Sequence, residues 1–194
     1  MSPGPSIAVV LKHAVSGNKF TGLSCACGHG IAIGIYAFIS AFGLMLVFQI
    51  NMLLFNVLQL VGIGVLLVMG IKLLTAKGTV ITQHDKVISR SHWYAARDGF
   101  LIAFVNPKAL VFFTAVFSQF LYQGMALIEK FGLVLVAFTA DTLWYSLVVL
   151  LVIQSSWLDR FHKYAWMLDR LFGGLLIFYC IFFTQTIVSK FNFA

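Results

Sequence analysis

The chain has 194 residues, of which 61% are hydrophobic and only 10% carry a charge, and its mean hydropathy is +0.98. Soluble domains carry roughly 25% charged residues, so this composition excludes an ordinary water-soluble protein and predicts a polytopic membrane protein. The formal charge of +7 does not indicate nucleic-acid binding, because the basic residues lie in short breaks between apolar runs and not on one face.

The first apolar run of the chain is too short to cross a membrane. It comprises residues 7–11, between Pro5 and Lys12 in MSPGPSIAVVLKH, whereas a spanning helix needs about 20 apolar residues. Two explanations are open: the first helix begins upstream of Met1, which we favour, or the protein begins with a half-helix. In either case this chain is predicted to start with a partial first helix.

Five longer apolar segments follow, and each is long enough to span the bilayer. They comprise residues 22–48, 53–74, 99–123, 131–154 and 171–189. They predict a single all-α transmembrane domain, 1–194, with two three-helix halves, about 1–74 and 99–194. A hydrophilic connection at 75–98 joins the halves, and an interfacial helix near Trp93 and Tyr94 is compatible with it. A repeat of three helices inserts in the opposite orientation, so the halves are expected to be inverted.

Most of the 13 Lys and Arg residues lie in three breaks, at residues 12–21, 72–98 and 159–170. Loops rich in Lys and Arg remain in the cytoplasm, so these breaks are predicted to be cytoplasmic. With six passes, both ends of the chain would then face outward.

The segment GLSCACGHGIAIGIYAF combines small residues with a single histidine. Gly30 and Gly34, four residues apart, form with Ala26 a small-residue face that predicts close contact with another helix. His29 has two open interpretations: a hydrogen-bonded packing residue, or a contact for a solute or a proton. Tyr36 has two as well, since it can line a cavity or pack as an ordinary aromatic residue, and the same holds for Trp144 and Tyr145.

The three cysteines do not predict a disulfide framework. Cys25 and Cys27 are two residues apart, so on a helix they point to different faces and make a poor joint metal site. We expect them to pack, and we expect no metal or cofactor.

Two proline interruptions occupy matching positions in the two predicted halves. Pro3-Gly4-Pro5 lies in the first, partial segment, and Asn106-Pro107 lies in the fourth. Broken helices at matching positions of inverted halves indicate a transporter binding site, because a break frees backbone N–H and C=O groups to meet a substrate. The alternative is a pair of plain proline kinks.

Lys108 and Asp141 are the two charged residues that the pattern places near the middle of the membrane. At about 1.5 Å per residue, Lys108 lies roughly 14 Å from the cytoplasmic end of its segment, and Asp141 lies roughly 20 Å from the cytoplasmic end of the next segment. Charges at this depth usually face a cavity and pair with one another. We expect Lys108 to hold a carboxylate and Asp141 to meet an ammonium group or carry a proton; a static ion pair is the alternative.

Several motifs together resemble the lysine-exporter and homoserine/threonine-resistance family of bacterial efflux proteins. They are SPGP at the start, GHGIAIGIYA in the second segment, GFLIAFVNPKALVFFTAVFSQF in the fourth and ADTLWY in the fifth. The resemblance covers nearly the whole chain, although family members typically have about half a helix before the proline-glycine-proline motif.

The resemblance implies a six-helix exporter of the bacterial inner membrane that is not an enzyme. Such proteins expel amino acids or derivatives, such as lysine, threonine, homoserine or homoserine lactone, at the expense of the proton gradient. The implied partners are the lipid bilayer, a small zwitterionic or cationic substrate and a proton, with a homo-oligomer left open. The residues that match the family's motif positions are Pro3, Gly4, Pro5, Asn106, Pro107, Lys108 and Asp141.

Two other functions are considered. A metal or other cation exporter would use His29 and Cys25 as ligands, but these ligands are isolated and no acidic cluster accompanies them. A membrane thiol-disulfide oxidoreductase would use Cys25 and Cys27, but such relays favour the spacing C-x-x-C and here it is C-x-C. A purely structural membrane subunit is a third alternative.

Overall fold

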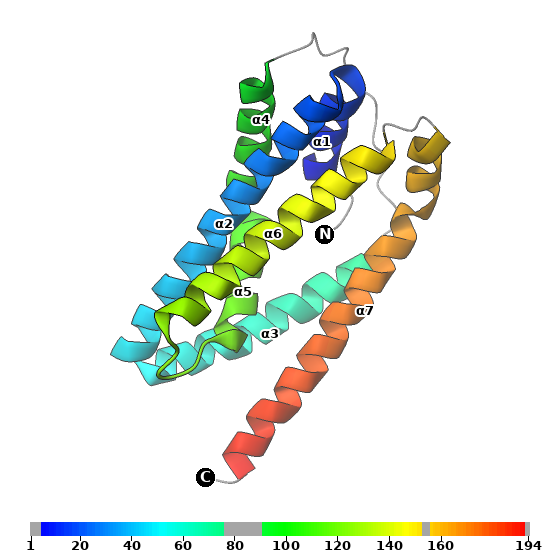
Figure 1. The fold of residues 1–194 in the computed structure, drawn as a ribbon. Coiled ribbons are helices and arrows are strands. Elements are labelled where there is room, and N and C mark those ends of the chain that lie inside the picture. Colours follow the sequence, from blue (N-terminus) through cyan, green and yellow to red (C-terminus); the bar gives the residue numbers. More distant parts are fainter. Residues whose placement is uncertain (1–4, 76–90, 153–155, 193–194) are drawn as a thin grey trace.

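The computed structural model describes residues 5–75, 91–152 and 156–192. Within these ranges all regular secondary structure is helical (Figure 1). The helices are α1 (Pro5–Ser16), α2 (Lys19–Ile50), α3 (Met52–Leu74), α4 (His92–Phe104), α5 (Pro107–Phe120), α6 (Leu127–Val152) and α7 (Ser156–Asn192). The all-α prediction is confirmed for this part of the chain.

Four helices are long and apolar enough to cross a membrane: α2, α3, α6 and the part of α7 from Trp166 to Gln185. The pair α4 and α5 passes the same test as one broken span, bent by 64°. Only 17% of the apolar window of α3 is buried inside the protein, so most of its apolar surface needs lipid as its solvent. The described residues therefore provide four or five spans, and α1 is a short apolar helix; the inverted halves stay a prediction.

Several helices extend beyond their predicted ends. α7 begins at Ser156 and not near 171, and α4 begins at His92, inside the predicted hydrophilic connection. The predicted break at 12–21 shrinks to a short turn around Gly17 and Asn18. An apolar run reveals only the part of a helix that lies in hydrocarbon, whereas backbone hydrogen bonding continues into water until a breaker intervenes. Residues 92–98 and 156–170 contain neither proline nor glycine.

The N-terminal half of α2 is the centre of one packing group, in which α1, α4 and α6 surround it (Figure 1). A buried apolar cluster holds this group together and includes Val10 of α1, Cys25 of α2, Ala95 of α4 and Val149 of α6. α3 packs against α5 and α7 in a second group. A further cluster around Phe55 and Phe117 joins α3 and α5 to the C-terminal half of α2.

Glycines allow α2 to approach two of its neighbours at backbone distance. A Cβ atom at Gly28 would overlap the carbonyl oxygen of Ala96, and one at Gly99 would overlap that of Cys25, so α2 and α4 cross with their backbones in contact. Against α6, a Cβ atom at Gly30 would overlap the Thr142 hydroxyl. The predicted small-residue face around Gly30 is thus confirmed, whereas the α2–α4 crossing was not predicted.

Candidate functional site

The interruption at Asn106-Pro107 is a true break between two helices. Asn106 is the N-cap of α5, and its side-chain oxygen accepts a hydrogen bond of 3.0 Å from the backbone N–H of Lys108. Pro107 occupies the first turn of α5, where the N–H that it lacks would have no partner in the helix. Asn106 and Pro107, which interrupt the apolar run, are therefore favourable residues at the start of a new helix.

Tyr36 of α2 stabilises the other side of this break. In a continuous helix the Phe104 carbonyl would accept from the N–H of Lys108, but that N–H is bonded to Asn106. The Tyr36 hydroxyl donates to the Phe104 carbonyl instead, and the two rings stack with centroids 5.5 Å apart. The structure thus gives Tyr36 an aromatic packing contact and a polar contact at the break, and its lining of a cavity stays a prediction.

His29 and Asp141 form a buried pair that links α2 to α6. Nδ1 of His29 lies 2.7 Å from Oδ2 of Asp141, and the two residues are only 4% and 5% exposed. An ionisable group at this depth is stable only with a partner, and each supplies one to the other. Two predicted site residues are therefore brought together, although the partner expected for Asp141 was Lys108.

The ring of Tyr145 covers this pair, with its centroid 4.4 Å from that of His29. The Tyr145 hydroxyl interacts with the hydroxyl of Ser6, the second residue of α1. We call His29, Asp141, Tyr145 and Ser6 the His29 centre. It connects Ser6, the residue that follows the SPGP motif, to the middle of α2 and α6.

Another acid, Asp169 of α7, lies within electrostatic range of Lys108. The positive charge of Lys108 acts on the Asp169 carboxyl group, and Asp169 is only 1% exposed. Its Oδ1 atom has no hydrogen-bond partner. Sequence reasoning missed Asp169, because it lies before the apolar run at 171–189 and looked like part of a basic cytoplasmic break. The acid in the LDR sequence at 168–170 was the only available signal.

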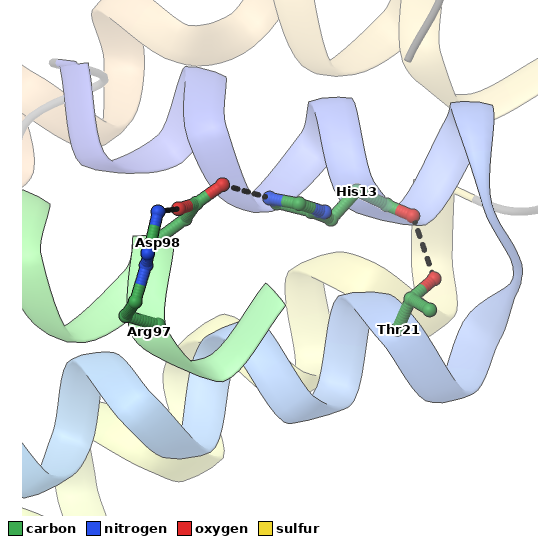
Figure 2. Close-up of polar contacts among 4 residues, drawn as sticks. All are labelled: His13, Thr21, Arg97 and Asp98. Carbon is green, nitrogen blue, oxygen red and sulfur yellow. Dashed lines mark hydrogen bonds and ion pairs between the residues drawn. The ribbon is translucent and has the colours of Figure 1, made fainter. Parts of the chain in front are cut away.

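A second histidine–aspartate pair lies at the end of the bundle that is predicted to be cytoplasmic (Figure 2). Nε2 of His13, on α1, is 3.2 Å from Oδ2 of Asp98, on α4, and Arg97 lies 3.7 Å from the same carboxylate. The Thr21 hydroxyl donates to the His13 carbonyl at 2.9 Å and so ties α1 to the start of α2. This pair was not predicted, because the apolar pattern places both residues in breaks between the spanning segments.

The remaining predicted residues are placed as follows. Pro5 begins α1, while Pro3 and Gly4 lie outside the described residues. Cys25 is buried and Cys27 is exposed, both as free thiols, so they point to different faces as expected. Within the described ranges no group of three or more potential ligands could hold a metal ion.

Comparison with known proteins agrees with the resemblance drawn from the motifs. Residues 1–186 match the family model described as LysE type translocator. A leucine efflux protein of Klebsiella pneumoniae is 27% identical over 177 residues, which cover 90% of this chain and 82% of that protein. A leucine efflux protein of Salmonella typhimurium is 30% identical over 123 residues, 61% of this chain and 56% of that protein.

No solved structure matches the chain. The family model, in contrast, covers nearly the whole sequence, including both interrupted motifs and every element of the site. With its apolar spans, this chain is therefore a multi-pass membrane protein that belongs to the LysE-type translocator family.

Proposed function

We propose that this protein exports an amino acid from the cytoplasm by proton-coupled alternating access. The observation that carries the proposal is the break between α4 and α5, bent by 64° within a membrane span. A break of this kind presents backbone groups and a helix N-terminus to a solute, and Lys108 adds a positive charge beside it. The leucine efflux activity named for the relatives supports an amino acid as the solute.

The packing is compatible with two inverted halves that move against each other. α2 packs against α6 and α3 packs against α7. These are the second and third helices of the two proposed halves, and an inverted repeat pairs equivalent helices in this way. The basic segments would face the cytoplasm of a bacterial inner membrane.

The His29 centre is our candidate for the proton-coupling site. A histidine and a carboxylate 2.7 Å apart can share one proton between them. If that proton left while the site stayed closed, an uncompensated negative charge would remain in a medium that solvates it poorly. Proton release is therefore favourable only when water reaches the pair, and this links protonation to the opening of one side.

The test separates coupling from transport in proteoliposomes that contain the purified protein. We expect Asp141→Asn to exchange labelled for unlabelled leucine across the membrane but to lose transport driven by a pH gradient. Asp98→Asn is the matched control, since it removes the carboxylate of the other histidine–aspartate pair, which lies at the end of the bundle. It should retain both activities.

Two results would contradict different parts of the proposal. Gradient-driven transport by Asp141→Asn at the wild-type rate would remove the pair from coupling. Failure of the wild-type protein to exchange leucine or any other amino acid would remove amino-acid export itself.

A further inference from the structure

Two buried polar atoms without hydrogen-bond partners lie on the neighbouring helices α6 and α7. They are Oδ1 of Asp169, on α7, and the indole nitrogen Nε1 of Trp144, on α6. The first is a hydrogen-bond acceptor and the second a donor, yet they form no hydrogen bond with each other. Buried polar atoms are nearly always paired in folded proteins, so two unpaired ones in one region call for an explanation.

The contact between α6 and α7 places these atoms on facing surfaces. The ring of Trp144 meets that of Phe172 edge to face, with centroids 5.7 Å apart. Asp169 precedes Phe172 by three residues and therefore lies on the same face of α7. Trp144 likewise follows Asp141 by three residues on α6, so this region adjoins the His29 centre.

Lys108 lies at the start of α5, and the other end of that helix contacts α7. Phe120 of α5 contacts the rings of Tyr179 and Phe183 of α7. Lys108 lies roughly 18 Å before Phe120 along its helix, and Asp169 lies roughly 15–21 Å before the two α7 rings, at about 1.5 Å per residue. Because α5 and α7 run in the same direction (Figure 1), the lysine and the aspartate are at similar levels, and the Asp169 carboxyl group lies within electrostatic range of Lys108.

We propose that Asp169, Lys108 and Trp144 bind the two charged groups of a zwitterionic α-amino acid. This proposal rests on the function proposed above and names the chemistry of its substrate. The ammonium group donates to Oδ1 of Asp169, while the carboxylate accepts from the indole N–H of Trp144 and pairs with Lys108. Both groups belong to one carbon atom of the substrate, so the proposal requires the acid and the base to lie on either side of that atom.

The aromatic wall of this region also indicates the side chain of the substrate. Trp144 and Phe172 offer an apolar surface beside the charged groups, and such a surface favours an aliphatic or aromatic side chain over a second charge. The expected class is a neutral, apolar α-amino acid with a free amino group and a free carboxylate. In this arrangement Asp141 takes part in proton coupling, and Asp169 binds the ammonium group of the substrate.

The experiment compares three competitors for exchange of radiolabelled leucine by the full-length protein in proteoliposomes. These are leucine, 4-methylpentanoate, which lacks the ammonium group, and leucinamide, which lacks the carboxylate. For the wild type we expect leucine to compete at least about tenfold better than either analogue, because a site built for hydrogen bonding rejects a ligand that leaves its groups unpaired.

The variants assign each preference to a residue. Asp169→Asn should lose most of the first preference, for leucine over 4-methylpentanoate. It should keep the second preference, for leucine over leucinamide. Trp144→Phe should keep the first preference and lose about threefold or more of the second, since it removes only the indole N–H. Arg170→Gln is the matched control: it neutralises the next residue of α7, which stacks on Trp166 at 4.6 Å, and should keep both preferences.

The assignment is overturned if Asp169→Asn keeps its full preference for leucine over 4-methylpentanoate, because Asp169 is then a structural partner of Lys108 only. If that variant does not fold, Asp169→Glu and Trp144→Phe decide. The proposal requires the first to retain the ammonium preference and the second to weaken the carboxylate preference. If the wild-type protein is active and the variants keep both of its preferences for leucine, only this assignment is refuted. If the wild-type protein is inactive, the proposed function is refuted.

Discussion

The protein keeps ionisable residues inside the bundle in two different ways. One is the His29 centre; the other is the group formed by Lys108, Trp144 and Asp169, which we call the Lys108 centre. In the first, Asp141 has a direct partner 2.7 Å away, and the ring of Tyr145 covers the pair. In the second, Asp169 is equally buried but leaves an oxygen atom without a hydrogen bond. The satisfied group stabilises the protein by itself, whereas the unsatisfied one has bonding capacity left for a ligand.

The largest effect should follow from breaking the satisfied pair. His29→Leu leaves the Asp141 carboxyl group buried without its partner, which should lower the free energy of unfolding by about 3–5 kcal/mol. The measurement is thermal unfolding in detergent, followed with a thiol-reactive dye that reaches the buried Cys25 and Cys180 as the protein opens.

The double variant His29→Leu/Asp141→Leu is its control. It removes both polar groups, so it should recover much of the lost stability while gradient-driven transport remains absent. If the double variant were less stable than His29→Leu, burial of an unpaired carboxyl group would not be the cause of the loss.

The same substitution at the two aspartates should have unequal effects on stability. Asp169→Leu removes an oxygen atom that has no hydrogen-bond partner, together with a negative charge within range of Lys108, so it should cost about 1–3 kcal/mol less stability than Asp141→Leu while it reduces leucine exchange. Asp141→Leu should lower stability. Equal losses of stability from both substitutions would contradict the distinction between a satisfied and an unsatisfied centre.

A moderate effect is expected at the break itself. Tyr36→Phe keeps the ring that stacks on Phe104 but removes the donor to its carbonyl, so stability should fall by about 1–2 kcal/mol. Exchange of leucine should weaken as well, because the geometry of the α4–α5 break depends on this bond. Tyr94→Phe, at an exposed position of α4, is the matched control and should change neither quantity.

The smallest effect is expected from the histidine–aspartate pair at the end of the bundle. Asp98 keeps 29% of its side chain exposed, and an asparagine at this position can still accept a hydrogen bond from His13, which is itself only 5% exposed. Asp98→Asn should therefore change the unfolding free energy by less than about 1 kcal/mol. A loss as large as that of His29→Leu would show that depth in the bundle does not govern the contribution of such a pair.

Some of these features could be predicted from local sequence. Composition identified the solvent as lipid, and apolar runs located the spans, because hydrocarbon excludes charged groups wherever a helix crosses it. Asn106 and Pro107 predicted a break because their preference for the start of a helix is local, and the break is present. The motifs also indicated the family, which the match over residues 1–186 confirms.

The partners of the charged residues were decided only by the tertiary structure. Depth along a helix suggested that Lys108 and Asp141 belong together, but depth does not say which face of each helix meets which neighbour. Gly30 lets α2 approach α6 closely enough for His29 to reach Asp141. Asp169 enters the bundle because α7 is helical well before its apolar run begins. Sequence determines which helices form and where they break, whereas side-chain pairing depends on helix rotation and spacing, which only packing sets.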